Sequence, residues 1–423
     1  MLNNQNIFHK KKILIYGLGI SGLSVFKFLK KNNQLVTYDD KKKSDIKKIT
    51  KIKFDYIIIS PGIDVYKCNL SKFLQVNSKK IYTDLDIFYN QYKQNKKITI
   101  TGTNGKSTTA KLLYEILKDQ KVDARLIGNI GNPVLLEKKV TKQTVFVIEA
   151  SSYQLEYSKL FKSNISLILN ISPDHLERHK TINRYVSAKF KLVQNQSKKN
   201  FALLNTKNFY IKKQLELKNF LPKIIKIEKS LDDNFLKKIN NRYFNTIGNR
   251  ENLSFILEVA KILKLKKKFL IKTLNRFKGL KYRQEVIFHS KKLTIINDSK
   301  ATTFSSSASL LKSLSNVYWI VGGQAKKGDK LLLTKKNCKN IKAYIFGNNK
   351  SFFISKIKKI MRYESFLDLK SLIKKLSSEI KIDKKIIHKT ILFSPSAASF
   401  DNFKNFEKRG EYFNKLIKKY INV

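Results

Sequence analysis

A short glycine-rich segment that ends in Lys-Ser-Thr is the pattern best suited to phosphate chemistry. Residues 101–108 read TGTNGKST; they follow a β-branched run at 97–102 and precede a helical pattern at 110–120. In a phosphate-binding loop, backbone N–H groups and the helix N-terminus hold phosphate oxygens, the lysine meets the β- and γ-phosphates, and the hydroxyl contacts Mg²⁺. The match is a shortened one, because Ile100 stands where the longer motif has its first glycine. We predict that this loop binds the phosphates of a nucleotide.

Two further polar residues stand at the ends of predicted strands. Glu149 lies in the run 145–150, and His175 follows the run 165–170. A glutamate and a neutral histidine at such positions could share a Mg²⁺ ion, although Mg²⁺ prefers oxygen ligands. The alternative for His175 is a capping or hydrogen-bonding role at the start of a helix.

A second glycine pattern occurs near the N-terminus. Gly17, Gly19 and Gly22 form G-x-G-x-x-G directly after a strand-like run, and Asp39 ends the next such run. This order is close to the dinucleotide fingerprint, in which the acidic residue binds ribose hydroxyls. Taken alone it indicates NAD and a dehydrogenase. Beside a phosphate loop in the next segment, it favours a nucleotide that the substrate itself carries.

The elements that must position these residues alternate along the chain. Short β-rich runs that end in glycine or polar residues occur at 12–17, 54–60, 97–102, 145–150, 165–170, 293–298, 317–323 and 391–396. Lysine-rich helical stretches separate them, which predicts an α/β fold with mostly parallel sheets and ligands at the carboxyl ends of the strands. Glycine-rich turns near residues 17, 102 and 322 predict three domains, at 1–93, 94–279 and 280–423.

The charge balance is strongly basic. The sequence holds 87 Lys+Arg against 31 Asp+Glu, a formal charge of +56. Only nine of the basic residues are arginines, and none lies in the first 124 positions. Nucleic-acid readers usually rely on arginine for bidentate contacts, so we interpret the excess as a solvated lysine surface that also attracts polyanionic substrates. A basic P-loop NTPase that binds nucleic acid is the alternative from another class of protein.

Several other classes are unexpected. The two cysteines, Cys68 and Cys338, cannot form a disulfide framework, which fits a reducing compartment. No apolar run approaches the ~20 residues of a membrane span, and the N-terminus lacks the pattern of a signal peptide. We expect a cytoplasmic protein, with a monomer as the default.

Taken in order, these motifs resemble the Mur ligases of peptidoglycan synthesis over nearly the whole chain. The segments that carry the resemblance are TGTNGKST (101–108), GNIGNP (128–133), EASSYQLE (149–156), SPDHLERH (172–179), YVSAK (185–189) and NDSKATT (297–303). The tail SPSAASFDNFKNFEKRGEYF at 394–413 is similar to that of the members that add D-glutamate.

The resemblance implies a fold and an activity. The fold is α/β in three domains: a Rossmann-like N-terminal domain, a central P-loop ATPase-like domain and a Rossmann-like C-terminal domain. The activity is ATP-dependent addition of D-glutamate to UDP-N-acetylmuramoyl-L-alanine through an acyl phosphate, with ATP and two Mg²⁺ ions. The partners would be small-molecule substrates, without nucleic acid or a membrane span. Addition of another amino acid is the alternative within the family.

Roles for individual residues follow from the resemblance alone. The UDP substrate would contact Ile20, Ser21, Asp39, Ser60, Gly62 and Asn129. ATP would contact Gly102, Thr103, Asn104, Gly105, Lys106, Ser107, Thr108, Asn252, Arg283 and Asp298. D-Glutamate would contact Lys300, Thr302, Lys326, Ser399 and Phe406. One Mg²⁺ would bind Ser107, and the second would lie among Glu149, His175 and Lys189 as a carbamate. Catalysis would rest on Lys106, Lys189, His175 and Glu149.

Some positions depart from the family pattern. The motif at 247–252 reads Ile-Gly-Asn-Arg-Glu-Asn and lacks a histidine, and a Pro-His-Arg sequence is replaced by 281–283, Lys-Tyr-Arg. Lys326 and Lys327 are adjacent, so either could bind glutamate; we choose Lys326.

Other positions have simpler interpretations. Phe400, Phe403 and Phe406 recur every third residue, which is typical of the apolar face of a helix that Ser399 would cap. Lys189 could be a solvated helix lysine like its neighbour Lys191.

Overall fold

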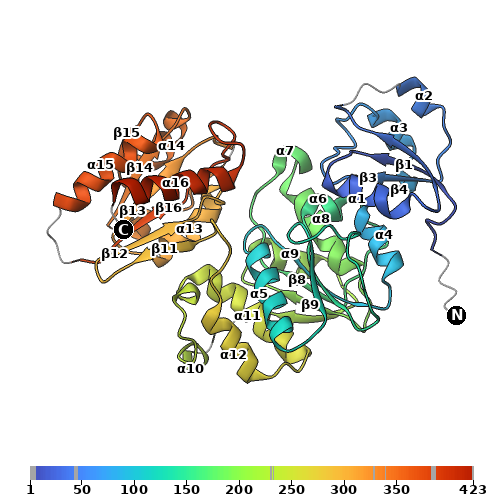
Figure 1. The fold of residues 1–423 in the computed structure, drawn as a ribbon, viewed down its shortest axis with the longest axis horizontal. Helices are drawn as coiled ribbons and strands as arrows, with labels where there is room; N and C mark the ends of the chain where they lie inside the picture. The colour runs from blue at the N-terminus through green and yellow to red at the C-terminus, as the bar shows by residue number, and fades with distance from the viewer. Residues whose placement is uncertain are drawn as a thin grey trace. The chain divides into compact units, whose positions relative to one another are not determined.

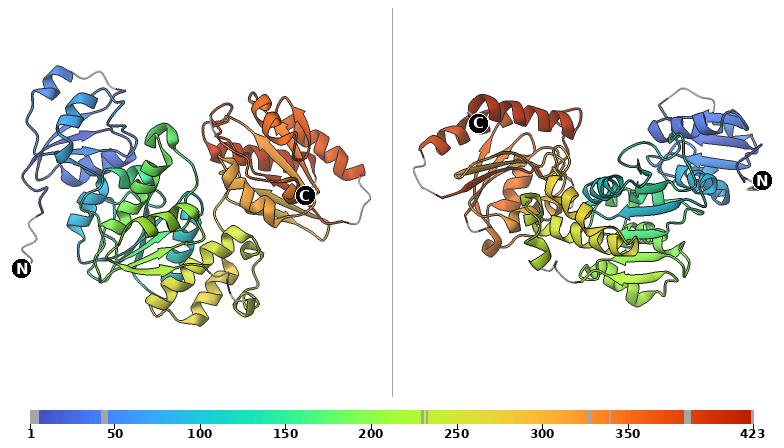
Figure 2. Two further views of the ribbon diagram at one scale, coloured as in Figure 1. Left: turned by 180° about the vertical axis from the view of Figure 1, so that it is seen from behind. Right: turned by 60° about the horizontal axis from the view of Figure 1, so that its bottom comes forward.

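The computed structural model describes residues 6–41, 46–228, 231, 233–326, 329–338, 340–382 and 387–421 (Figure 1). The chain divides into two compact units, one of residues 1–231 with 252–273 and one of residues 232–251 with 274–423. The described residues contain three sheets, two in the first unit and one in the second (Figure 2). The α/β class and the parallel sheets are confirmed, whereas the domain boundaries after residues 93 and 279 stay a prediction.

The first sheet has the strand order β2-β1-β3-β4, and all its pairs are parallel. Its strands are β1 (Lys12–Tyr16), β2 (Gln34–Tyr38), β3 (Tyr56–Ile59) and β4 (Ile81–Tyr82). Its helices are α1 (Ile20–Leu29), α2 (Ile46–Thr50), α3 (Ser71–Val76), η1 (Ser78–Lys80) and α4 (Asp84–Gln91). Residues 13–16 of β1 are all buried, as expected for a parallel strand covered on both faces.

The second sheet has the order β10-β9-β8-β5-β7-β6 and is also parallel. Its strands are β5 (Lys96–Thr101), β6 (Ala124–Gly128), β7 (Val145–Glu149), β8 (Ile165–Ile168), β9 (Phe201–Leu204) and β10 (Lys223–Lys226). The helices along this stretch are α5 (Lys106–Asp119), α6 (Ser152–Glu156), α7 (Leu176–His179), α8 (Ile182–Gln194), α9 (Phe209–Leu217), α10 (Asp233–Leu236), η2 (Arg242–Asn245), α11 (Ile247–Ile262) and α12 (Lys267–Arg276). Because β5 lies between β7 and β8, the loops that follow these three strands meet at one edge.

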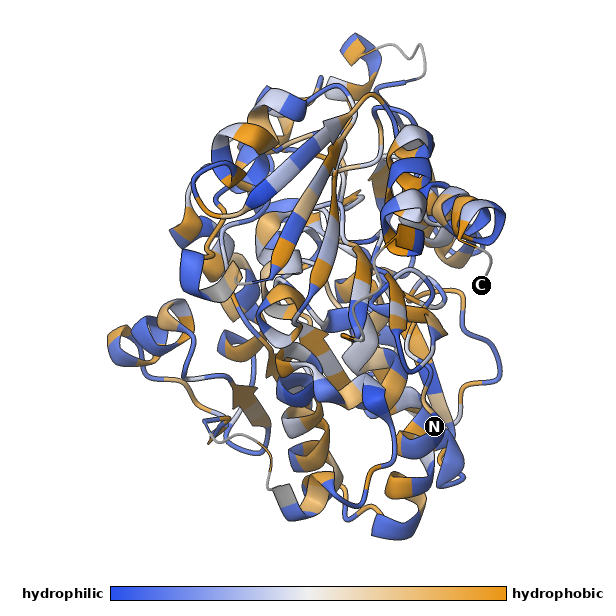
Figure 3. Cartoon of the chain, turned by 90° about the vertical axis from the view of Figure 1, so that its left-hand side faces the viewer, coloured by the Kyte–Doolittle hydropathy of each residue, from blue (hydrophilic) through white to orange (hydrophobic). Residues whose placement is uncertain are grey.

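The third sheet has the order β11-β12-β16-β13-β14-β15, parallel except for the antiparallel pair β11–β12. Its strands are β11 (Glu285–His289), β12 (Leu293–Asn297), β13 (Val317–Gly322), β14 (Ile341–Phe346), β15 (Arg362–Phe366) and β16 (Lys389–Phe393). Its helices are α13 (Phe304–Ser313), η3 (Lys335–Cys338), α14 (Lys350–Ile357), α15 (Leu369–Ile382) and α16 (Phe406–Tyr420). Hydrophobic and hydrophilic residues alternate around the helices, which lets each helix bury one side (Figure 3).

Each of the eight predicted strand runs contains a strand, but two local predictions are wrong. Phe400 is 72% exposed and lies outside any helix, because α16 begins only at Phe406. Asn405 caps that helix by accepting the N–H of Lys408. Ser399 is therefore not the cap; its carbonyl oxygen accepts the N–H groups of Asn402 and Phe403, in the turn that leads to α16. The spacing of three came from a turn and a helix start, not from one helical face.

The remaining differences are small. The helix predicted at 110–120 begins earlier, at Lys106, and β16 ends at Phe393, so residues 394–396 form a loop. No helix in the described part of the chain combines the length and the apolar character that crossing a bilayer requires.

Candidate functional site

The segment 102–105 forms a tight turn between β5 and α5. Gly102 and Gly105 have φ values of 152° and 83°, which favour glycine. Asn170, after β8, fixes the turn, since its backbone oxygen accepts the N–H of Thr103 and its side-chain oxygen accepts the N–H of Asn104. A Cβ at Gly105 would lie 2.4 Å from Oδ1 of Asn252, so the predicted nucleotide residue Asn252 does lie against this loop. The turn presents the N-terminus of α5, where Ser107 and Thr108 are buried.

Two lysines converge on this loop. Lys106 Nζ donates to the carbonyl oxygens of Gly102 and Thr103, and Lys189 Nζ, from α8, donates to Gly102 as well. Lys189 is only 1% exposed. Burial, followed by the charge of Lys106, lowers the pKa of Lys189 well below its ordinary value, while Asp174 and Glu149 oppose the shift.

Lys189 is therefore not a solvated helix lysine. Its ammonium lies 4.6 Å from the centre of the Tyr185 ring, and the Tyr185 hydroxyl lies 3.1 Å from that of Thr103. Lys191, which was predicted to be a solvated lysine, is not fully solvated either, because its Nζ donates to the backbone oxygen of Glu156.

Glu149 ends β7 beside the loop and is buried. Asn129 donates to Glu149 twice, from its amide Nδ2 to Oε1 and from its backbone N–H to the backbone oxygen, both at 2.9 Å. The other carboxylate oxygen, Oε2, is buried and has no partner among the residues that the structure describes. A buried oxygen without a partner is what a bound Mg²⁺ would satisfy.

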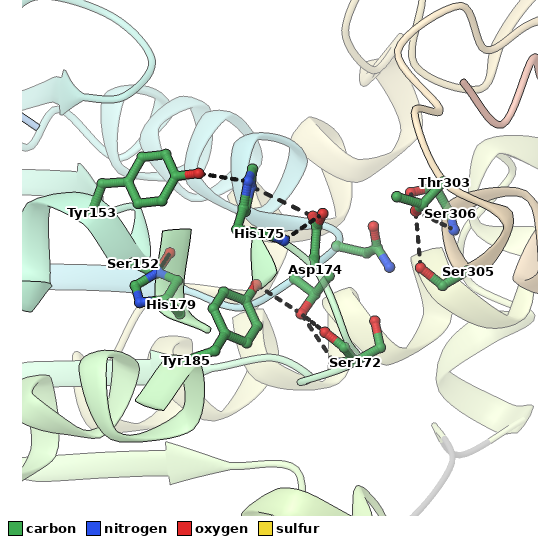
Figure 4. A network of polar contacts seen from close by, with 12 residues as sticks. Ser152, Tyr153, Ser172, Asp174, His175, His179, Tyr185, Thr303, Ser305 and Ser306 are labelled. Carbon is green, nitrogen blue, oxygen red and sulfur yellow. Dashed lines mark hydrogen bonds and ion pairs between the residues drawn. The ribbon is translucent and has the colours of Figure 1, made fainter. Parts of the chain in front are cut away.

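His175 precedes α7 with a φ of 55°. Its Nδ1 lies 2.9 Å from the Tyr153 hydroxyl and its Nε2 lies 3.5 Å from Asp174 Oδ2 (Figure 4). The His175 side chain makes no capping hydrogen bond to α7. Its contacts with Tyr153 and Asp174 fit the hydrogen-bonding alternative, and its role as a Mg²⁺ ligand stays a prediction. Within the described ranges, no group of three His, Cys, Asp or Glu side chains is arranged to hold a metal ion.

Sequence analysis missed His179, which lies on α7 one turn after His175. Its ring is buried, with Nε2 3.0 Å from the Ser152 hydroxyl. Burial and the charge of Arg178 lower the pKa of His179 to about 4, so the ring is neutral near pH 7. The spacing of four between the histidines of SPDHLERH was the signal that could have indicated it.

In the first sheet, the glycine-rich turn is closely packed. Gly17 has a φ of 88°, and a Cβ at Gly22 would lie 1.8 Å from the Gly17 oxygen. The carboxylate of Asp39 accepts the N–H groups of Leu18 and Lys41, at 2.7 and 3.0 Å. Asp39 therefore holds the backbone of the turn through Leu18, and its contact with a ribose stays a prediction.

Four other predicted UDP residues lie on or beside this turn, whereas Asn129 lies beside Glu149 in the second sheet. Ser60 donates from Oγ to the Gly17 oxygen at 2.7 Å, and a Cβ at Gly62 would meet nothing within 4 Å. Ile20 is exposed, whereas Ser21 hydrogen-bonds with the buried carboxylate of Asp84. Burial raises the pKa of Asp84 to about 6.

In the second unit, Asp298 is buried at the end of β12. It accepts the Ser394 hydroxyl at 2.9 Å and the N–H of Gln284 at 3.1 Å. Burial raises the pKa of Asp298 to about 7, although the charges of Arg283 and Arg409 oppose the shift. Arg283 and Asp298 thus lie near each other, as predicted for two nucleotide-binding residues.

The structure brings together two of the predicted glutamate residues. Lys300 Nζ lies 4.0 Å from the centre of the Phe406 ring. Ser399 is buried, and the carbonyl oxygen of Lys326 accepts the N–H of Asp329. Thr302 is half-buried beside Thr303, the residue that caps α13. Lys327 lies outside the described residues.

Arg409 is a further buried residue that sequence analysis missed. It donates to the Ser299 oxygen at 2.7 Å, the Ala397 oxygen at 2.9 Å and the Ala398 oxygen at 3.1 Å. Its guanidinium therefore joins the loop after β12 to the loop after β16. The sequence offered one signal for this role: Arg409 is the single arginine of the tail 394–413, in a chain whose 87 Lys+Arg include few arginines.

Comparisons with known proteins agree along the chain. The Mur ligase middle domain matches residues 100–262. The UDP-N-acetylmuramoylalanine–D-glutamate ligase of Rickettsia prowazekii is 34% identical over 446 residues, which cover 98% of this chain and 99% of the relative. That of Francisella philomiragia is 32% identical, over 96% of both chains.

Solved structures show the same fold. UDP-N-acetylmuramate-alanine ligase MurC from Thermotoga maritima has a TM-score of 0.55 at 16% identity, over 97% of this chain and 99% of that one. MurF ligase from Thermotoga maritima in complex with ADP has a TM-score of 0.58 at 12% identity, over 100% and 99%. The chain therefore belongs to the Mur ligase family and, within it, to the group of UDP-N-acetylmuramoylalanine–D-glutamate ligases.

Proposed function

We propose that this chain uses ATP to join D-glutamate to UDP-N-acetylmuramoyl-L-alanine, in the synthesis of peptidoglycan precursors. The observation that carries the proposal is the site at the end of the second sheet, where Lys106, Lys189 and Glu149 meet around the phosphate loop. The full-length similarity to D-glutamate ligases supports the choice of amino acid.

The reaction has two steps. An oxygen of the L-alanyl carboxylate attacks the γ-phosphorus of ATP, the bond to the β-phosphate breaks, and ADP leaves. The amine of D-glutamate then attacks the acyl phosphate and loses a proton, and inorganic phosphate leaves the tetrahedral intermediate. The sum is one ADP, one phosphate and one amide bond per ATP.

Three anions must meet in this reaction: the triphosphate, the acceptor carboxylate and glutamate. We assign Lys106 to the ATP phosphates together with the N–H groups of the loop 102–105, and Arg283 and Asn252 to the rest of the nucleotide. Fixed cations and N–H donors offset the charge that develops on the transferred phosphoryl group. Lys300 and Lys326 are assigned to the glutamate carboxylates, as point charges.

We assign two Mg²⁺ ions to this chain, one at Ser107 and one at Glu149, His175 and Lys189. When bound, Mg²⁺ neutralises charge on phosphate oxygens. The oxygen Oε2 of Glu149, which has no partner among the described residues, fits such an ion.

Carbamylation of Lys189 would need a neutral amine. The nitrogen lone pair attacks the carbon of CO₂, and the amine proton leaves to solvent, so that an anionic carbamate remains. The lowered pKa of Lys189 favours that neutral amine.

The remaining assignments are coarser. We propose domains at 1–93 for the UDP substrate, 94–279 for ATP and 280–423 for glutamate. The protein would act as a cytoplasmic monomer on small molecules without nucleic acid; the free cysteines Cys68 and Cys338 fit a reducing compartment.

A phosphate-release assay tests the proposal. Folded protein receives ATP, Mg²⁺ and UDP-N-acetylmuramoyl-L-alanine, with D-glutamate, L-glutamate or no amino acid. We expect release to depend on D-glutamate. Release with neither amino acid isomer would contradict ligase activity, and binding of nucleic acid that weakens steeply with salt would favour the basic NTPase instead.

A further inference from the structure

Helix α7 is fastened to the first sheet by Arg178, a residue to which no role has been assigned above. Its terminal nitrogens donate to the backbone oxygens of Ile63, at 2.6 Å, and Gly62, at 3.5 Å. The side chain is only 8% exposed. Both acceptors lie in the turn 60–63 that follows β3, within the same compact unit as α7.

The guanidinium is held equally firmly on its other side. Nε donates to Oε2 of Glu156, at the end of α6, and one terminal nitrogen lies 3.1 Å from the same oxygen. The rings of Tyr153 and Tyr157 lie 5.2 and 5.8 Å from its central carbon. Burial raises the pKa of Glu156, and the charge of Arg178 opposes this shift, so the carboxylate stays available as a partner.

The turn 60–63 is part of the predicted nucleotide contact. Ser60 binds the glycine-rich turn through the Gly17 oxygen, and Ile63 donates its N–H back to Ser60. The open space beside Gly62 leaves room for a ligand to approach the backbone. A change in the position of this turn would therefore move the nucleotide end of the substrate.

The other side of Arg178 reaches the reacting end. Tyr153, whose ring lies beside the guanidinium, also holds His175 through its hydroxyl. One guanidinium thus touches both the turn that would bind UDP and the ring that positions His175.

We propose that Arg178 is a positioning residue that sets the distance between the nucleotide turn and His175, so that a substrate anchored by its UDP places its carboxylate at the phosphate loop. The inference rests on the proposed function. Arginine suits this role because its planar fork can donate to two carbonyls and a carboxylate at once, which a lysine ammonium cannot do in the same geometry. A displacement of about 1 Å in such an arrangement can lower a rate by about 100-fold.

The test compares Arg178→Gln and Arg178→Lys with wild type. For each, we measure the affinity for UDP alone, the affinity for ADP, the thermal midpoint, and kcat with saturating UDP-N-acetylmuramoyl-L-alanine. We expect the glutamine variant to keep both affinities within about twofold while kcat falls at least about tenfold, and the lysine variant to recover part of kcat. The matched control is Arg184→Gln, on the exposed side of α8, which should behave as wild type.

Each other outcome overturns the role. If the kcat of Arg178→Gln stays within twofold of the wild-type value, Arg178 has no positioning role. Parallel loss of kcat, UDP affinity and thermal midpoint in both variants makes Arg178 a structural support instead. An inactive wild-type protein would remove the proposed function first and this role with it, whereas an active wild type with an active Arg178→Gln variant overturns the positioning role alone.

Discussion

Lys106 and Lys189 donate to the same backbone oxygen, that of Gly102, at 3.0 and 2.8 Å. Two ammonium groups around one oxygen repel each other, and the fully buried one has the higher cost of carrying its charge. Lys189 is that residue, and its pKa is lowered accordingly. We therefore propose a division of roles, in which Lys106 binds phosphate and Lys189, whose lowered pKa favours the neutral amine, reacts with CO₂.

Replacing Lys106 tests the first half of this division. We expect Lys106→Ala to abolish phosphate release, because the phosphates lose their nearest cation, while binding of the UDP substrate to the first sheet persists. Steady-state assays and calorimetry with the UDP substrate measure the two properties. Simultaneous loss of turnover and of UDP-substrate binding in a folded variant would contradict separate nucleotide sites.

Replacing Lys189 tests the second half. We expect Lys189→Ala to lose nearly all activity and to regain part of it when short carboxylic acids are added, since these can supply the oxygen ligand that the carbamate would provide. Lys199→Ala, which removes an exposed lysine, is the control and should remain fully active without additive. If Lys189→Ala is as active as the wild type without any added carboxylic acid, the carbamate is contradicted.

We predict that the activity depends on pH through Asp298. Its pKa of about 7 means that the carboxylate gains a proton as the pH falls through neutrality. We therefore expect kcat/KM for ATP to fall from pH ~8 to ~6, approaching tenfold per pH unit on the acid side.

The raised pKa of Asp298 affects activity and stability in opposite directions, so a loss of activity at low pH can be told apart from unfolding. Because the folded chain takes up this proton more readily than the unfolded chain, Asp298 adds stability as the pH falls through about 7. In Asp298→Asn, the acid limb of the profile should disappear from the residual activity. An unchanged limb would assign the titration to another group.

Two glycines of the first sheet make a matched pair. Gly22→Ala places a Cβ 1.8 Å from the Gly17 oxygen, whereas a Cβ at Gly19 would meet nothing within 4 Å. We expect Gly22→Ala to cost about 2 kcal/mol or more of stability, because backbone must move, and Gly19→Ala to change it by less than about 0.5 kcal/mol. Thermal unfolding with and without UDP measures both. Equal midpoints for the two variants would contradict the close packing at Gly22.

Much of this site could be predicted from local sequence. The strand runs are continuous and β-branched, which places Glu149 at the end of β7. The loop 102–105 lies between a strand and a helix, which places Lys106 at the start of α5. Asp39 was found too, but local sequence could not show that its carboxylate is used by the N–H of Leu18.

The residues that sequence analysis missed act over long distances along the chain. Arg409 binds oxygens of residues 299, 397 and 398, and Arg178 binds oxygens of residues 62 and 63. Their partners are set by how strands order in a sheet, which no local spacing encodes. Phe400 is an error of the other kind. The spacing of Phe400, Phe403 and Phe406 is typical of a helix, but a turn occupies the residues before α16 begins at Phe406.

The most direct measurement of the central claim is the mass of the product. Folded protein is incubated with ATP, Mg²⁺, UDP-N-acetylmuramoyl-L-alanine and either D- or L-glutamate, and the nucleotide products are identified by mass spectrometry. With D-glutamate we predict one UDP-linked product that is heavier by one glutamyl residue, together with one equivalent of ADP. ADP without that product, or equal product from L-glutamate, would contradict the account.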